Sequence, residues 1–355
     1  MKYSRSLVGV CLSAALLAAC SGGSNGLSLS APTLVAPPIP ARQSVAGSVS
    51  PPLTESSNLY VVNYNGNTVT VYAPGTASVL RKVSQGVNHP DALAFDGSGS
   101  LYVANLGGNG GNGTVAVYAV ASKVVLRKIS QGVNHPVALT FDTSGNLFVA
   151  NRFSNTVTVY ASGSGSVLRT ISQGVNQPDA LAFDGSGNLF VANNNNNTVT
   201  VYAPGSGSVL RTISEGVDFP YALAFDGLGN LYVANGLNST VTVYAPGSGS
   251  VLRTISEGLN GPYALVFSHA GDLYVANDAY KVNTVTVYAP GSTSVLRTIS
   301  QGVDSPLALA FDGPGNLFVA NGLNSTVTVY GHGGKKLRRT ISQGVDGPNA
   351  LKFGP

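Results

Sequence analysis

Residues 178–217 have the sequence PDALAFDGSGNLFVANNNNNTVTVYAPGSGSVLRTISEGV, and most of the chain repeats this unit with small changes. The segment TVTVY, written TVAVY in one copy, occurs seven times and measures the period. Its copies begin at Thr68, Thr114, Thr156, Thr198, Thr240, Thr284 and Thr326, with spacings of 46, 42, 42, 42, 44 and 42 residues. A nearly fixed period of this length indicates a repeat architecture.

Each unit contains four short runs rich in β-branched and aromatic residues. In the quoted copy they are ALAF, LFVAN, TVTVY and VLRTIS, and turn-forming sequences such as DGSGN and APGSGS separate them. Four short strands in about 40–45 residues are typical of one blade of a β-propeller. We call these strands a to d in chain order.

Strands a and b are apolar on both faces, so other parts of the protein must pack against both faces. Polarity rises toward strand d, which predicts strand a at the axis and strand d at the rim.

The two ends of the repeat array are complementary. The first copy starts at Leu59 with a strand b, and the chain ends with a strand a in residues 348–355, PNALKFGP. We therefore predict an all-β fold for residues 58–355. It is a seven-bladed β-propeller of four-stranded antiparallel blades, in which the C-terminal strand completes the N-terminal blade. Such closure removes the free sheet edges that an open array would expose.

The N-terminal residues differ in composition from the repeats. Residues 1–19 combine a basic head with a short apolar core, which is typical of a bacterial secretory signal. The sequence LAAC that ends at Cys20 resembles the lipobox of bacterial lipoproteins, and the resemblance implies that this cysteine is acylated and becomes the lipid anchor. An ordinary signal peptide with an incidental cysteine is the alternative. Residues 20–57 are rich in Ser, Gly, Pro and Ala, which predicts a flexible tether.

These features predict a location in the bacterial cell envelope, with contact to a membrane only through the N-terminal lipid. Ser21, rather than an acidic residue, follows the cysteine. In lipoproteins of the enterobacterial type that pattern permits the outer membrane, so we expect the outer membrane or the cell surface rather than the inner membrane. We expect the protein to be a monomer.

Charge and cysteine content exclude several classes of function. The precursor has a net charge of +4, and loss of two basic residues with the signal peptide leaves +2, so we expect no nucleic-acid partner. The only other cysteine, Cys11, lies in the signal peptide, which excludes disulfides and thiol catalysis. Equivalent arginines of strand d predict a basic belt at the rim. It is either a solvated outer strand whose charge protects the edge, or a surface that attracts anionic envelope polymers or lipid head groups. The arginines are Arg81, Arg127, Arg169, Arg211, Arg253, Arg297 and Arg339.

The blade pattern resembles a known family. A proline followed by ALAFD, GSGNLFVAN, a polar loop and TVTVYAPG is similar to the blades of NHL-repeat propellers and their bacterial relatives, which include virginiamycin B lyase and the gluconolactonase group. The resemblance covers residues 58–355 and implies the propeller fold. The family includes protein binders, RNA binders, lyases and lactonases, so it implies no single activity. Strand b ends in VAN where many NHL repeats have Asp, so an Asp-based metal or catalytic ring is not carried over.

Sequence differences between the repeats gather on one side of the predicted disc. In an antiparallel blade the b–c and d–a loops share one face, which we call the loop face, and the nearly invariant a–b and c–d turns share the opposite turn face. Aromatic and polar residues interleaved on the loop face predict a recognition surface for sugars or peptides, although drift in weakly constrained loops gives the same pattern. The candidate binding residues are Tyr64, His89, Asp91, His135, Arg152, Phe153, Asp179, Phe219, Tyr221, Tyr263 and Tyr280.

Three functions are consistent with these observations. We expect a binding or scaffold module that recognises a protein or glycan partner in the envelope through the loop face. The alternative is a metal-dependent lyase or lactonase-type hydrolase on the same face, with His89, Asp91 and His135 as candidate catalytic residues. A third interpretation is a mainly structural surface protein. No motif predicts a bound cofactor, and the sequence assigns no ligand set to a divalent metal.

Overall fold

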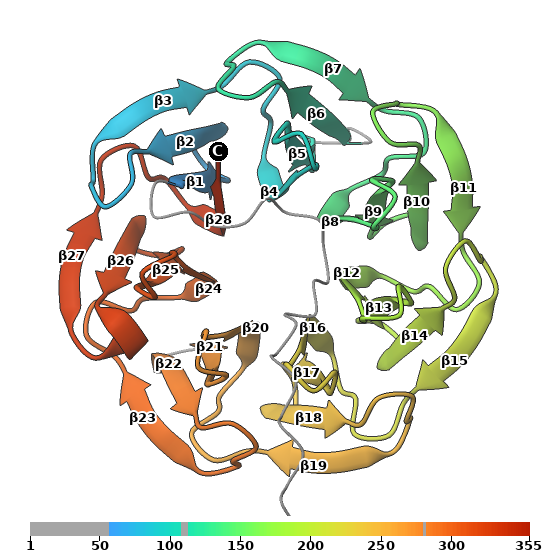
Figure 1. The fold of residues 1–355 in the computed structure, drawn as a ribbon, viewed down its shortest axis with the longest axis vertical. Coiled ribbons are helices and arrows are strands. Elements are labelled where there is room, and N and C mark those ends of the chain that lie inside the picture. The colour runs from blue at the N-terminus through green and yellow to red at the C-terminus, as the bar shows by residue number, and fades with distance from the viewer. Residues whose placement is uncertain (1–56, 108–112, 280–281) are drawn as a thin grey trace, which may run out of the picture. The chain divides into compact units, whose positions relative to one another are not determined.

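The computed structural model describes residues 57–355 apart from residues 108–112 and 280–281. Seven four-stranded antiparallel sheets surround a central axis (Figure 1), which confirms the predicted seven-bladed propeller. The predicted signal peptide, the anchor Cys20 and all but the last residue of the predicted tether lie outside the described residues. Within the described part of the chain, no helix has the length and hydrophobicity needed to cross a membrane.

The strands have the following bounds, given from the axis to the rim. Blade one consists of β28 (Pro348–Gly354), β1 (Asn58–Asn63), β2 (Thr68–Tyr72) and β3 (Val79–Val83). In blades two to seven, strand a is β4 (Pro90–Phe95), β8 (Pro136–Phe141), β12 (Pro178–Phe183), β16 (Pro220–Phe225), β20 (Pro262–Phe267) and β24 (Pro306–Phe311). Strand b is β5 (Leu101–Asn105), β9 (Leu147–Asn151), β13 (Leu189–Asn193), β17 (Leu231–Asn235), β21 (Leu273–Ala279) and β25 (Leu317–Asn321). Strand c is β6 (Thr114–Tyr118), β10 (Thr156–Tyr160), β14 (Thr198–Tyr202), β18 (Thr240–Tyr244), β22 (Val282–Tyr288) and β26 (Thr326–Tyr330). Strand d is β7 (Val125–Ile129), β11 (Val167–Ile171), β15 (Val209–Ile213), β19 (Val251–Ile255), β23 (Val295–Ile299) and β27 (Leu337–Ile341), and a short 3-10 helix, η1 (His332–Gly334), precedes β27.

The C-terminal strand closes the ring as predicted. β28 pairs antiparallel with β1 and places Phe353 opposite Leu59. The ring of Phe353 packs edge-on against Phe318 of blade seven, with 5.0 Å between the ring centroids. The Tyr60 hydroxyl donates a hydrogen bond of 2.5 Å to the carbonyl oxygen of Pro355. The first and last strands of the propeller therefore share one sheet and one core.

The order of the strands is as predicted, but the order of their burial is not. The rise in polarity from strand a to strand d suggested that strand c is less buried than strand a, yet four of the five residues of β14 are buried and Thr200 is 1% exposed. Strand a was expected to be covered on both faces, yet four of the six residues of β12 are only half-buried, because β12 is the end strand of its sheet and lines a cavity with β8 and β16. Strands b and c therefore form the buried core of each blade.

An asparagine at the end of strand b explains how strand c buries its threonines. Asn193 is fully buried, and its Nδ2 donates to the hydroxyl oxygen of Thr200 at 3.0 Å. Its Oδ1 accepts the backbone N–H of Asn176, in the loop that enters the same blade, at 3.0 Å. The bond to the loop recurs in every blade, at Asn63, Asn105, Asn151, Asn193, Asn235, Asn277 and Asn321. The VAN motif is thus a structural clamp that joins strands b and c to the d–a loop.

Four of the seven strand d arginines also join neighbouring blades, because each donates to a backbone carbonyl oxygen of the next blade. Arg211 is half-buried and lies over the ring of Phe190, 5.9 Å from its centroid. Its Nη1 donates to the carbonyl oxygen of Gly247 in the next blade at 2.7 Å. The outward position beside it belongs to Leu210, which is 57% exposed. Similar cation–π contacts are made by Arg81, Arg169, Arg253, Arg297 and Arg339.

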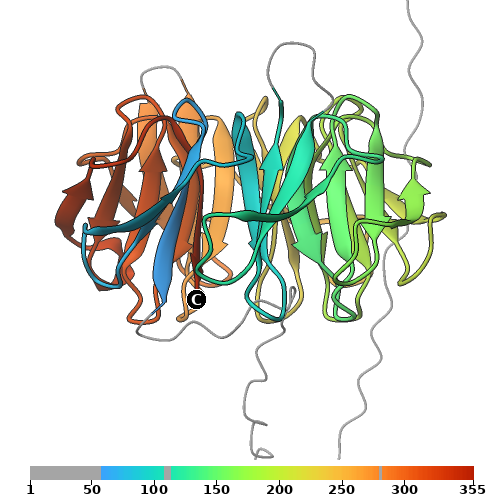
Figure 2. The same cartoon turned by 90° about the horizontal axis from the view of Figure 1, so that it is seen from above.

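The two faces of the disc are built as the repeat pattern predicts (Figure 2). On the turn face, the Asp184 Oδ1 accepts the backbone N–H groups of Ser186 and Asn188 at 2.9 Å each. On the loop face, the residue before the strand a proline has a positive φ in all seven repeats. These residues are His89, His135, Gln177, Phe219, Gly261, Ser305 and Gly347. The conformation costs a non-glycine residue about 1–2 kcal/mol. The four large side chains at this position of the loop face therefore lower the stability of the folded protein.

Candidate functional site

The second residue of each strand a lies at the loop-face end of the innermost strand. Seven such residues surround the axis, and we call them the mouth ring. In blade order they are Asn349, Asp91, Val137, Asp179, Tyr221, Tyr263 and Leu307. The sequence predicted four of them as binding residues, and the structure brings these four into one ring.

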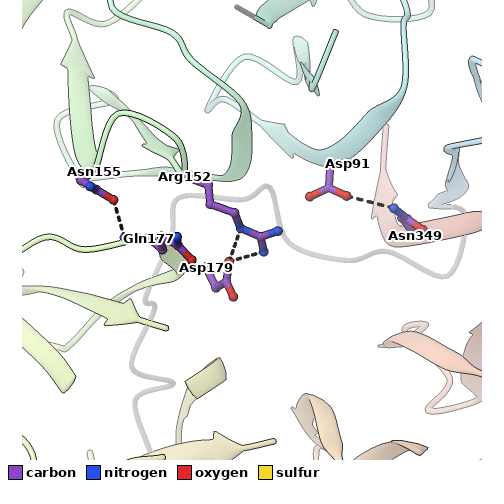
Figure 3. A network of polar contacts seen from close by, with 6 residues as sticks. All are labelled: Asp91, Arg152, Asn155, Gln177, Asp179 and Asn349. Carbon is purple, nitrogen blue, oxygen red and sulfur yellow. Dashed lines mark hydrogen bonds and ion pairs between the residues drawn. The ribbon is translucent and has the colours of Figure 1, made fainter. Parts of the chain in front are cut away.

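Two polar pairs occupy one side of the mouth ring (Figure 3). The Asn349 Nδ2 donates to the Asp91 Oδ1 at 2.9 Å and joins blades one and two. Arg152 follows β9 directly and reaches Asp179 of the next blade, with a hydrogen bond of 2.7 Å from its Nε to the Asp179 Oδ1 and an ion pair from its Nη2. Sequence analysis left out Asn349, although it occupies the same repeat position as Asp91 and Asp179. Alignment of the repeats on the strand a proline is the signal that finds it.

Aromatic side chains occupy the side formed by blades five and six. The rings of Tyr221 and Tyr263 lie 5.0 Å apart between centroids and are tilted by 39°. Phe219 packs edge-on against Tyr221 at 5.4 Å. Phe219 and Tyr263 remain 37% and 36% exposed, so these large rings are open to a ligand.

Two further aromatic pairs lie on the same face. His135 stacks on Phe153, with 3.8 Å between the ring centroids. Tyr64 packs edge-on against His89 at 5.1 Å. The structure thus places both histidines against aromatic neighbours. Tyr280 lies outside the described residues.

The mouth ring is one electrostatic cluster. Burial raises the pKa of Asp91 to about 6, while the hydrogen bond from Asn349 and the charge of Arg152 lower it in part. Burial also raises the pKa of Asp179 against the opposing effect of Arg152. The pKa of Tyr263 is raised by burial, and the negative charges of Asp91 and Asp179 add to this effect. At neutral pH Tyr263 is therefore a hydrogen-bond donor, and Asp91 is a carboxylate that takes up a proton in mildly acidic solution.

The structure does not gather the three candidate catalytic residues into one metal site. The His89 Nδ1 lies 2.9 Å from the Oδ1 of Asn88, and His135 and Asp91 have the partners already described. Among residues 57–107, 113–279 and 282–355, no group of three or more His, Cys, Asp or Glu side chains is placed to hold a metal ion. The arrangement favours hydrogen bonding and ring stacking to a small polar ligand over metal coordination.

Asp91→Asn is expected to stabilise the protein at pH 8 and to leave its stability almost unchanged at pH 4. The folded-state pKa of about 6 lies above the unfolded value of 3.8, so the folded state binds the proton more tightly. The resulting stabilisation is complete below pH 3.8 and is lost as the pH rises through 6. The variant should therefore gain about 3 kcal/mol at pH 8. Urea unfolding at both pH values measures the effect.

Asp346→Asn, at an exposed position on the same face, controls for the loss of a charge. An equal effect of Asp91→Asn at pH 4 and pH 8 would contradict the proposed uptake of a proton.

Comparison with known proteins identifies the fold. No family model matches the sequence, and no curated protein matches it significantly. A protein of unknown function from Desulfotomaculum acetoxidans DSM 771 aligns with a TM-score of 0.70 and 14% identity, covering 84% of this chain and 99% of its own. A candidate 6-phosphogluconolactonase from Bacteroides fragilis NCTC 9343 aligns with a TM-score of 0.69 and 17% identity over 85% and 99% of the two chains. The periplasmic gluconolactonase of Pseudomonas aeruginosa aligns with a TM-score of 0.66 and 22% identity over 84% and 99%. At these identities the similarity shows the fold alone: this chain is a seven-bladed β-propeller whose structural neighbours include proteins of the gluconolactonase kind.

Proposed function

We propose that the mouth ring binds a carbohydrate, and that the protein is a binding module of the cell envelope. The observation that carries the proposal is the pair Tyr221 and Tyr263 beside the Asp91–Asn349 and Arg152–Asp179 pairs. Aromatic rings stack on the apolar faces of a sugar, and carboxylate, amide and guanidinium groups bond to its hydroxyls. Both kinds of group surround the same axis in this chain.

Calorimetric titration of the full-length chain with glucose, gluconate, N-acetylglucosamine and their oligomers tests this proposal. At least one of these saccharides is expected to bind, and Tyr263→Ala should weaken it about tenfold, the equivalent of about 1.4 kcal/mol. Phe219→Gly is a second variant that avoids unfolding, because it removes the ring at a backbone position where Gly261 already occurs in another blade. Ser305→Gly is its matched control at the equivalent position of blade seven. Binding that is unchanged in both aromatic variants would refute the site.

Hydrolysis of a sugar lactone is the second candidate function. Two features favour it: burial raises the pKa of Asp91 to about 6, and the fold is similar to that of proteins described as gluconolactonases. Asp91 would act as a general base: it takes a proton from a water molecule while the oxygen of that water attacks the carbonyl carbon of the lactone. The ring ester bond then breaks, and the leaving oxygen takes up a proton to give the hydroxy acid.

Hydrolysis of glucono-δ-lactone above its spontaneous rate tests this second candidate. The enzyme-dependent rate should rise as the pH passes through 6 and should be lost in Asp91→Asn. Saccharide binding without any enzyme-dependent hydrolysis would leave the protein as a binding module.

The envelope location rests on the N-terminal sequence. We propose that Cys20 carries the lipid, that residues 20–57 tether the propeller, and that the blades belong among the NHL-repeat propellers. Incorporation of labelled palmitate should depend on Cys20, and Cys20→Ser should release the chain from the membrane fraction. Incorporation of labelled palmitate into the Cys20→Ser variant would contradict the assignment of Cys20 as the anchor.

A further inference from the structure

At the end of the channel opposite the mouth ring, one blade has a different type of residue from the other six. The fifth residue of strand a is small and uncharged in blades two to seven, where it is Ala94, Thr140, Ala182, Ala224, Val266 and Ala310. In β28 the same position is Lys352. Among the seven described a strands, β28 alone has a charged residue at this position, and β28 is the strand that closes the ring.

Lys352 lines two cavities toward the turn face. One has a volume of about 380 Å³ and is lined by the inner strands β8, β12 and β16, including Leu181 and Leu223. The other has a volume of about 430 Å³ and is lined by β20, β24 and β28, including Leu309 and Phe311. Since Lys352 belongs to both linings, its side chain lies between them. Apart from Lys352 and His269, the walls consist of apolar side chains, glycines and one threonine.

Among the residues that the structure describes, the ammonium group of Lys352 has no counter-ion. Within the described part of the chain, no residue forms a hydrogen bond or an ion pair with its Nζ. Burial lowers its pKa, and no carboxylate lies close enough to oppose that effect. A cation held in apolar surroundings without a partner is unfavourable, and a bound anion would compensate it.

We propose that the turn-face end of the channel binds a small carboxylic acid with an apolar body. The carboxylate pairs with the Lys352 Nζ, and the apolar body packs against the leucine, alanine and phenylalanine side chains of the inner strands. Besides Lys352, His269 and Thr140, the side chains that line the two cavities offer no polar group to the hydroxyls of a sugar acid. This site is separate from the mouth ring and does not depend on its function.

Calorimetric titration of the full-length chain with octanoate tests the proposal. We expect saturable binding of one octanoate, no comparable binding of the neutral octanamide, and at least about a tenfold loss of affinity in Lys352→Met. Lys123→Met, at an exposed position in a c–d turn, is the matched control and should bind octanoate as the parent does. Equal affinity for octanoate and octanamide, or equal affinity in Lys352→Met, would overturn the proposal.

A measurement on the unaltered chain keeps the test independent of folding of the variant. Octanoate should slow the acetylation of Lys352 by acetic anhydride and should leave that of Lys123 unchanged, as followed by mass spectrometry of peptides. Acetylation of Lys352 at the same rate with and without saturating octanoate would also overturn the proposal.

Discussion

A chain that ends at residue 347 is expected to lose most of its stability. Removal of β28 deletes strand a of blade one, exposes the edge of β1 and uncovers the core that contains Phe353 and Leu351. The buried Phe353 contributes about 1.5–3 kcal/mol and the half-buried Leu351 contributes less, while the total stability of a domain is about 5–15 kcal/mol. A thermal melt followed by circular dichroism should therefore show a large fall in melting temperature or no cooperative transition.

Two further samples refine this test. Leu351→Ala should give an intermediate loss of about 2 kcal/mol, because it keeps the backbone of β28. A synthetic peptide of residues 348–355 should restore part of the melting temperature by pairing with β1. An unchanged melt of the truncated chain would show that the C-terminal strand is not needed for closure.

Asn193→Asp is expected to destabilise the protein by about 3 kcal/mol at pH 8. Asn193 is fully buried, and its Nδ2 donates to the hydroxyl oxygens of Thr198 and Thr200 and to the carbonyl oxygen of Val191. An aspartate keeps the acceptor for the d–a loop, but it loses these donors and buries a negative charge. Urea unfolding measures the loss, which should be smaller at pH 4, where the carboxyl group is protonated more readily.

Asn196→Asp is the matched control for this clamp. Asn196 is exposed in the adjoining loop, and its Oδ1 only accepts a bond from the Thr198 hydroxyl. An aspartate can accept the same bond, so little change is expected. A loss in Asn193→Asp no larger than that in Asn196→Asp would contradict the structural role of the clamp.

The fold could be predicted from the sequence because the seven repeats can be aligned with one another. The period, the four runs per unit and the complementary ends define the blades and their closure, and the structure confirms all three. Burial of strand c could not be predicted from its alternation of valine and threonine. It depends on Asn193 and Thr200 meeting across the sheet, which a register defines and a linear pattern does not. The packing of Arg211 over Phe190 could not be predicted either, because it also depends on how the strands align in the sheet.

The sequence predicted the face on which the candidate residues lie, but not their contacts. Variation between repeats pointed to the loop face, where the mouth ring lies. Pairs such as Asp91 with Asn349 join residues 258 positions apart, so only the closed ring brings them together. The sequence shows that the C-terminal strand contains Lys352, but it does not show what surrounds this side chain. Its surroundings depend on the channel that the six small residues at the same level help to form.

Hydrogen–deuterium exchange of the full-length chain, with and without the saccharide that binds most tightly in calorimetry, tests the role of the mouth ring most directly. Peptides that span Asp91, Asp179, Tyr221 and Tyr263 are expected to gain protection, while the a–b and c–d turns and Lys352 should exchange as before. Protection confined to the turn face, or binding by none of the saccharides, would contradict a carbohydrate site at the mouth ring.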